Sequence, residues 1–213
     1  MSAPPTSLPP AVLLIGPTGS GKTPLGDWLE AHGLWGRRWH HFDFGARLRA
    51  VVAEGPSSRY RREEIQFLSD VIEKGVLLEN ESFALAERVL DEFMARRCVQ
   101  PEDLLLMNGL PRHVGQALAL DNRLRCVAVV QLVCDAATVI ERLRRDSGGD
   151  RAGRRDDDPA LVARKLAIFA ERTRPLVEHY RGGGARLISV PVGVATTPRE
   201  TIEWLKNMIP AGL

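Results

Sequence analysis

The stretch that decides the fold of this chain lies near its beginning and reads Gly16-Pro17-Thr18-Gly19-Ser20-Gly21-Lys22-Thr23. It fits the pattern G-x-x-x-x-G-K-[ST], and it stands between the apolar run 11–15 and an amphipathic segment, which is the strand–loop–helix setting that the pattern requires. Glycines let successive backbone N–H groups turn towards an anion, and the N-terminus of the following helix adds its dipole. The stretch therefore predicts a phosphate-binding loop (P-loop).

The side chains of this loop predict a nucleoside triphosphate as its ligand, and we expect ATP with Mg²⁺. Lys22 should reach the β and γ phosphates, and the Thr23 hydroxyl is placed to bind Mg²⁺. The residues whose backbone we expect around the phosphates are Gly16, Gly19, Ser20 and Gly21. The loop alone does not say what receives the phosphate.

Outward from the loop, short apolar runs alternate with amphipathic stretches of helical period. The predicted strands are 11–15, 39–42, 104–107, 127–133 and 187–190. The predicted helices are 22–32, 44–53, 63–74, 82–95, 114–120, 136–145, 159–180 and 198–208, with Pro175 expected to kink or end the long one. Nearly all-apolar strands between helices predict an α/β fold with a doubly wound, five-stranded parallel sheet in three layers.

Composition sets limits on the partners. The 213 residues suit one domain, and the net charge of +2 is too small to predict nucleic acid or a membrane as a partner. Three cysteines fit no metal site and are read as reduced, which favours the cytoplasm. No apolar run approaches the length of a membrane span.

A second group of polar residues follows the predicted strand 104–107. Asn108-Gly109-Leu110-Pro111-Arg112 leaves the end of that strand, where ligands bind in a doubly wound sheet. Arg112 offers a forked cation to a phosphate, and Gln116 lies one helical turn further on the same face. A carboxamide can donate and accept together, which suits an adenine edge.

These residues resemble the adenylate kinase family of nucleoside monophosphate kinases. The family's D-G-F-P-R-x-x-x-Q-A pattern appears as N-G-L-P-R-H-V-G-Q-A from Asn108, and its T-G-x-x-x-R element as Phe44-Gly45-Ala46-Arg47-Leu48-Arg49. The remaining matches, in the family's order, are Gly75-Val76-Leu77-Leu78, Val139–Leu143, Arg154–Asp157, Thr173-Arg174-Pro175 and Tyr180. The resemblance covers most of residues 11–208 and implies a P-loop kinase that transfers a phosphoryl group from Mg-ATP to a monophosphate, preferably AMP.

The resemblance also implies a role for each matching position. Arg49 and Arg112, beside Gly45 and Gly109, would hold the acceptor's phosphate, and Gln116 would read its adenine. On the ATP side and in the lid, the corresponding residues would be Arg142, Arg154, Lys165 and its neighbour Arg164. Cations that converge in this way neutralise the transferred group, so Lys22, Arg112, Arg154 and Lys165 are the predicted catalytic residues.

The resemblance implies a division of the chain as well. The kinase core would comprise residues 11–43, 76–145 and 158–213, after a flexible tail at 1–10. Residues 44–75 would form the excursion that binds the monophosphate, and 146–157 a short lid. The lid holds no Cys or His, which excludes a zinc lid, and the family expectation is a monomer.

The match has departures. The family's Asp, which orients the water ligands of Mg²⁺, is Asn108 here, and Asp43 or another carboxylate could compensate. Phe44 replaces the family's Thr and either stacks on a base or packs in the core. Asp146 stands at the position of a lid arginine. His113 is read as a solvent-facing helix residue, so no His-based dyad is expected.

Two alternatives to a monophosphate kinase stay open. One is a related P-loop kinase for another small phosphate or hydroxyl metabolite, and a hydroxyl acceptor would need a carboxylate base such as Asp43. The other is a degenerate homologue that binds nucleotide without kinase activity, which Asn108 favours.

Overall fold

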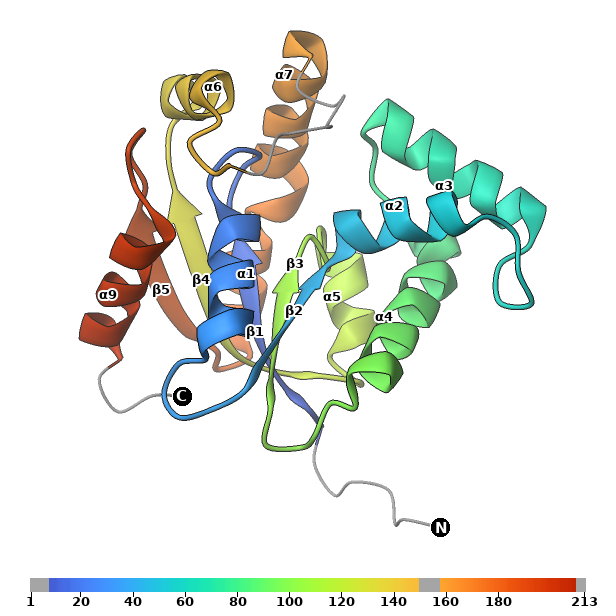
Figure 1. The fold of residues 1–213 in the computed structure, drawn as a ribbon, viewed down its shortest axis with the longest axis horizontal. Helices are drawn as coiled ribbons and strands as arrows, with labels where there is room; N and C mark the ends of the chain where they lie inside the picture. Colours follow the sequence, from blue (N-terminus) through green and yellow to red (C-terminus); the bar gives the residue numbers. More distant parts are fainter. Residues whose placement is uncertain (1–7, 150–157, 210–213) are drawn as a thin grey trace.

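The computed structural model describes residues 8–149 and 158–209, which form a parallel sheet between two layers of helices (Figure 1). The five strands have the order β2-β3-β1-β4-β5, and every pairing is parallel. They are β1 (Pro10–Ile15), β2 (Trp39–Asp43), β3 (Leu104–Asn108), β4 (Arg125–Val133) and β5 (Arg186–Pro191). The predicted doubly wound α/β fold is confirmed.

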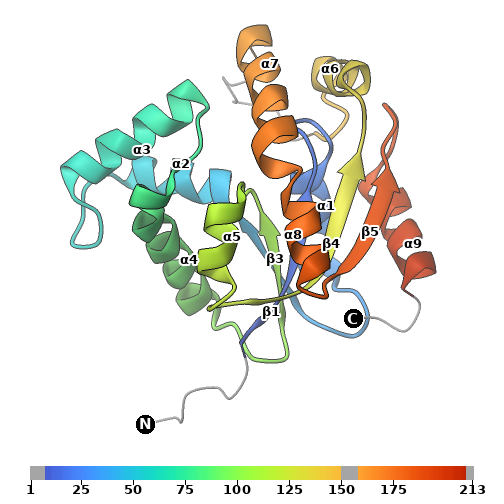
Figure 2. The same ribbon diagram turned by 180° about the vertical axis from the view of Figure 1, so that it is seen from behind.

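Both faces of the sheet are covered, which explains why its strands are apolar at nearly every position. Helices α1 (Lys22–His32) and α9 (Pro198–Met208) cover one face, while α4 (Phe83–Arg97), α5 (Val114–Leu120) and α8 (Leu176–Gly182) cover the other (Figures 1 and 2). Side chains alternate between the two faces along each strand. In β1, Leu14 packs in the core under α1 and α9, whereas Leu13 packs in the opposite core.

Helices α2 (Phe44–Glu54) and α3 (Arg62–Lys74) contact each other beside the sheet, in the region predicted as an excursion. In the segment between them, Tyr60 is buried, and the Tyr60 hydroxyl donates a hydrogen bond to Glu92 Oε2 at 3.0 Å. This contact fixes the connection against α4.

The predicted long helix 159–180 is divided into three pieces. α7 (Pro159–Ile168) runs into one π-helical turn, η2 (Phe169–Thr173), and α8 begins directly after Pro175. The expectation for Pro175 is confirmed, since its ring occupies the position where an N–H would otherwise be needed. The π turn was not expected, and π turns are frequent at functional sites.

The remaining elements are η1 (Asn80–Ser82) and α6 (Ala136–Arg145), which lies with α7 above the carboxyl ends of the strands (Figure 1). Across residues 8–149 and 158–209, no helix has the length and apolar character that crossing a bilayer demands.

Candidate active site

The P-loop connects the end of β1 to the start of α1. Gly21 is the N-cap of α1 at φ 94°, and no side chain caps the helix. The first N–H groups of a helix have no partner within it, so this uncapped end offers its donors and its dipole to an anion. A Cβ on Gly21 would also come within 3.1 Å of the Arg142 guanidinium. The backbone thus has the geometry of a phosphate cradle.

Two cations are anchored on this loop. Lys22 Nζ donates to the carbonyl oxygens of Gly16 at 2.8 Å and Pro17 at 2.7 Å, which holds the ammonium beside the cradle. The buried Arg142 donates to the Gly19 carbonyl at 2.9 Å, and its Nη1 donates to the carbonyls of residues 193, 194 and 196 at 2.7, 3.2 and 3.0 Å. Arg142 therefore ties the loop to the segment that joins β5 to α9.

Two adjoining cavities open over the carboxyl edge of the sheet. The first has about 920 Å³ of empty space and is lined by the P-loop, the ends of β2 and β3, and the π turn. The second has about 700 Å³ and is lined by α2, α3 and the segment Gly75–Leu78, with apolar side chains such as Phe44 and Leu48. Phe44 is a buried wall of the second cavity. The residues common to both cavities are Gly45, Arg49, Gly109, Arg112 and Lys165.

The three shared side chains are all cations, and they come from three different elements. Arg49 lies on α2, Arg112 follows β3, and Lys165 lies on α7. Burial lowers the pKa of Arg112, yet a guanidinium keeps its charge in proteins. Partial removal from water strengthens its attraction for a phosphate. The boundary between the cavities is therefore a place where negative charge would be neutralised.

Gln116 lines the second cavity and is almost completely buried. Its Oε1 accepts a hydrogen bond from the Arg112 backbone N–H at 2.7 Å, and its Nε2 donates to the Leu78 carbonyl at 2.8 Å. A carboxamide has two N–H groups and two acceptor lone pairs, so one of each remains for a ligand.

The expectation for His113 is wrong, because its ring is buried rather than facing solvent. His113 precedes α5 as its N-cap with extended backbone at φ −152°, so the helical periodicity does not govern where its side chain points. Its Nε2 lies 3.2 Å from the Leu78 carbonyl oxygen and 3.9 Å from the Glu79 carboxylate. His113 thus supports the segment that lines the second cavity.

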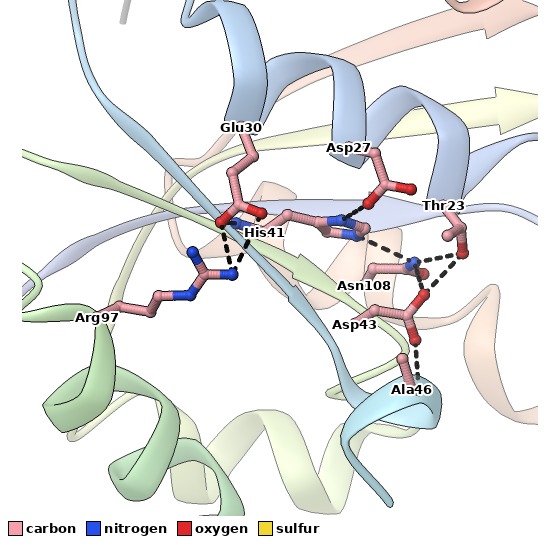
Figure 3. A network of polar contacts seen from close by, with 8 residues as sticks. All are labelled: Thr23, Asp27, Glu30, His41, Asp43, Ala46, Arg97 and Asn108. Atoms are coloured by element: carbon pink, nitrogen blue, oxygen red, sulfur yellow. Dashed lines mark hydrogen bonds and ion pairs between the residues drawn. The ribbon is translucent and has the colours of Figure 1, made fainter. Parts of the chain in front are cut away.

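A polar network lies at the floor of the first cavity (Figure 3). Asp43 and Asn108 are paired in register at the ends of β2 and β3. Asp43 Oδ2 accepts hydrogen bonds from Thr23 Oγ1 at 2.7 Å and Asn108 Nδ2 at 3.0 Å, while Oδ1 accepts from the Ala46 N–H at 2.8 Å and caps α2. Burial raises the pKa of Asp43, but the bonds from Thr23 and Ala46 and nearby positive charge outweigh it and leave the pKa below its usual value.

The network continues behind Asn108 to a histidine that sequence reasoning missed. Asn108 Nδ2 lies 3.4 Å from His41 Nε2, and His41 Nδ1 lies 2.9 Å from Asp27 Oδ1. The ring fits only because residue 26 is glycine, since a Cβ there would come 2.3 Å from His41 Nε2. A glycine inside a helix is the signal that could have pointed to such a close contact.

The oxygen atoms of Thr23 and Asp43 suit a hard cation. Within residues 8–149 and 158–209, no group of three or more His, Cys, Asp or Glu side chains could hold a metal unaided. Mg²⁺ needs no such cage, because it is commonly bound by one or two protein oxygens together with substrate phosphates and water. A hydroxyl and a carboxylate beside a phosphate cradle fit this mode.

Most predicted site residues lie on the walls of the two cavities. Two exceptions are Ser20, whose hydroxyl is buried and has no hydrogen-bond partner within residues 8–149 and 158–209, and Arg142, which braces the loop from behind. Arg154 and most of the predicted lid lie outside the described residues, so the role of Arg154 stays a prediction. Among residues not predicted, Phe169 and Thr173 reach the first cavity from the π turn.

Known proteins resemble this chain along most of its length, although no protein-family model matches it. An adenylate kinase of Synechococcus sp. (strain CC9311) is 32% identical over 179 residues, which cover 81% of this chain and 85% of the relative. An adenylate kinase of Parvibaculum lavamentivorans is 31% identical over 185 residues, covering 81% and 80%. One of Sinorhizobium medicae is 30% identical over 200 residues, covering 89% and 96%.

Proposed function

This chain belongs to the adenylate kinase family, and we propose that it transfers the γ-phosphoryl group of Mg-ATP to AMP, giving two molecules of ADP. As a member it is an ATP-dependent phosphotransferase and a nucleoside monophosphate kinase. The proposal concerns the acceptor, the use of Mg²⁺ and the residues that act. We further expect it to act as a monomer in the cytoplasm, without nucleic acid.

The observation that carries the proposal is the shared wall of the two cavities. A donor triphosphate in the P-loop would place its γ-phosphate towards Arg49, Arg112 and Lys165, and an acceptor in the second cavity would bring its phosphate to the same cations. Phosphoryl transfer requires in-line placement and neutralisation of charge rather than covalent catalysis. Mg²⁺ would neutralise further negative charge on the phosphates.

The second cavity favours a purine acceptor. Its apolar walls from α2 and α3 can cover a planar base, and Gln116 retains one N–H and one lone pair for the polar edge of adenine. Arg112 stands between this cavity and the P-loop, where it would hold the phosphate of AMP by its forked guanidinium.

The alternative of a hydroxyl acceptor is less well supported. It would need Asp43 as a general base, and an efficient base has a pKa near the operating pH. Hydrogen bonds from Thr23, Asn108 and the Ala46 N–H instead stabilise the ionised carboxylate and keep its pKa low. A phosphate acceptor needs no base.

The test is the formation of ADP from Mg-ATP with AMP, CMP, UMP, GMP and dGMP offered separately. We expect turnover with AMP at least about tenfold above any other acceptor, in line with recognition by a hydrogen-bonding side chain. Faster turnover with a different monophosphate than with AMP would reject AMP as the acceptor. Tight ATP binding with no turnover on any of the five would support the degenerate homologue.

A further inference from the structure

The family's carboxylate at the end of β3 is absent from this chain, while its neighbouring strand carries one. Asn108 stands at the β3 position, and Asp43 is its register partner at the end of β2. Adjacent strands lie about 4.8 Å apart. A negative charge on Asp43 is therefore displaced by one strand from the family's position, and it still lines the first cavity beside Thr23.

The hydrogen bonds of Asp43 show which of the two residues carries the charge. Its Oδ2 accepts from Thr23 Oγ1 at 2.7 Å and from Asn108 Nδ2 at 3.0 Å. A carboxylate can only accept, so the atom of Asn108 that faces it must be the amide nitrogen. Asn108 is thereby a neutral donor that holds the Asp43 carboxylate towards Thr23.

The amide of Asn108 is held in this orientation from behind. Asp27 accepts from His41 Nδ1, which leaves His41 Nε2 to face the second N–H of Asn108 at 3.4 Å as its acceptor. His41 is buried and Asp27 is largely exposed, with side-chain exposures of 3% and 65%. Turning the amide over would place its oxygen against an acceptor on each side, so Asn108 has one satisfied orientation.

We propose that Asp43 is the magnesium-side carboxylate of this enzyme, and that Asn108, oriented by His41 and Asp27, is the positioning residue that aims it. The inference rests on the proposed use of Mg-ATP. It implies that this chain keeps one carboxylate beside the metal, at the end of β2 instead of the end of β3. Asn108 therefore does not mean that the metal site has lost its negative charge.

A charge exchange between the two strands tests this directly. The variants are Asp43→Asn, the double variant Asp43→Asn/Asn108→Asp, and Asp91→Asn as a control that removes an exposed carboxylate outside both cavities. Asn at position 43 can still accept from the Ala46 N–H, so α2 keeps its cap. The measurement is the affinity of Mn²⁺ for the complex with a non-hydrolysable ATP analogue, from the electron paramagnetic resonance of free Mn²⁺.

We expect Asp43→Asn to weaken Mn²⁺ binding by about tenfold or more, the usual cost of losing a group that holds or orients a metal. The double variant should return to within about threefold of the wild type, and Asp91→Asn should match it. Binding of the analogue in EDTA and thermal unfolding report whether each variant still folds. An unchanged Mn²⁺ affinity in Asp43→Asn, or a double variant no better than the single one, would overturn the proposal.

The Mn²⁺ titration uses no acceptor nucleotide and involves no turnover, so its result does not depend on whether AMP is the acceptor. A wild type that binds Mn²⁺ as expected but does not phosphorylate AMP contradicts the proposed function and leaves the role of Asp43 standing. A wild type that phosphorylates AMP, together with an Asp43→Asn variant that binds Mn²⁺ normally, contradicts the role of Asp43 alone.

Discussion

The cations at the P-loop and those at the boundary between the two cavities are held differently. Lys22 and Arg142 donate to backbone carbonyls of the P-loop and of the segment after β5, so both cations are part of the framework. By contrast, the guanidinium groups of Arg49 and Arg112, which line both cavities, form no hydrogen bond with any other residue of the described ranges 8–149 and 158–209. The P-loop is thus shaped before a ligand arrives, whereas the boundary presents guanidinium donors to one.

We therefore distinguish framework cations (Lys22 and Arg142), which hold the backbone in place, from boundary cations (Arg49 and Arg112), whose guanidinium groups are available to a ligand. Loss of a framework cation should lower the unfolding free energy, because it leaves backbone carbonyls without their hydrogen-bond donors. Loss of a boundary cation should weaken substrate binding and turnover and leave the unfolding free energy nearly unchanged. Four experiments test or sharpen the contrast.

The largest effect is expected for Lys22→Met. This change removes the cation that we propose for the β and γ phosphates and also frees the carbonyls of Gly16 and Pro17. We expect kcat/KM for ADP formation to fall by about 10²–10³-fold, the usual cost of losing one preorganised electrostatic contact in a transition state. The measurement is steady-state ADP production, with thermal unfolding as a check. A fall of less than tenfold would contradict the role of Lys22.

Arg112→Lys should give the next largest effect. Lysine keeps the charge but cannot fork to two phosphate oxygens, so we expect kcat/KM for AMP to fall by about 10–100-fold. Arg123→Lys is a matched control, because Arg123 pairs with Glu87 and Asp91 away from both cavities. Activity of Arg112→Lys equal to that of the control would show that a point charge suffices.

The contrast itself is tested by the pair Arg142→Met and Arg49→Met. The first removes the hydrogen bonds that the buried Arg142 donates to several backbone carbonyls, including those of Gly19 and Gly193, and should lower the unfolding free energy by about 2–3 kcal/mol. The second should leave that free energy within about 0.5 kcal/mol and raise the KM for AMP instead. Urea denaturation and steady-state kinetics give both quantities. Equal stability losses in the two variants would contradict the distinction between framework cations and boundary cations.

The smallest effect is expected at Glu64 in the first turn of α3, outside the linings of both cavities. Its pKa is lowered, chiefly by the hydrogen bond from the Arg61 N–H and then by that from Arg88. A carboxyl with a depressed folded pKa stabilises the protein above its unfolded pKa, and the stabilisation is lost as pH falls through the folded value. Glu64→Gln should therefore cost at most about 1 kcal/mol at pH 7, with the difference vanishing in acid. Urea denaturation from pH 7 to pH 3 measures it, and a difference that grows in acid would contradict this sign.

Much of the fold could be predicted because its signals are local. Helices α1, α5, α6 and α9 begin and end at the predicted residues, since caps, prolines and periodicity all lie within a few positions of each boundary. The π turn at Phe169–Thr173 could not be predicted in this way. Its backbone hydrogen bonds join residues five apart, as from the Arg174 N–H to the Phe169 carbonyl, rather than four apart, and no side-chain pattern in 159–180 marks that difference.

In the candidate site too, local features could be predicted from the sequence and contacts between distant residues could not. The P-loop is one contiguous stretch, so its sequence predicts its geometry. The link from His41 to Asn108 spans 67 residues, and that from His41 to Asp27 spans 14, so only the pairing of β2 with β3 and the packing of α1 bring these groups together. Asp43 could be named from the sequence as a possible substitute, but its bonds to Thr23 and Asn108 required the fold.

The close packing of Gly26 against His41 determines the order in which substitutions at these two positions can be accepted during evolution. A side chain at position 26 would collide with a ring that Asp27 and Asn108 hold in place, so Gly26 cannot be replaced first. Alanine at position 26 would favour helix α1 by about 1 kcal/mol over the glycine. A lineage can gain that free energy only after losing His41, and with it the second acceptor of Asn108. Relatives that carry glycine and histidine at these two positions together with asparagine at position 108 should therefore have inherited the three as a unit.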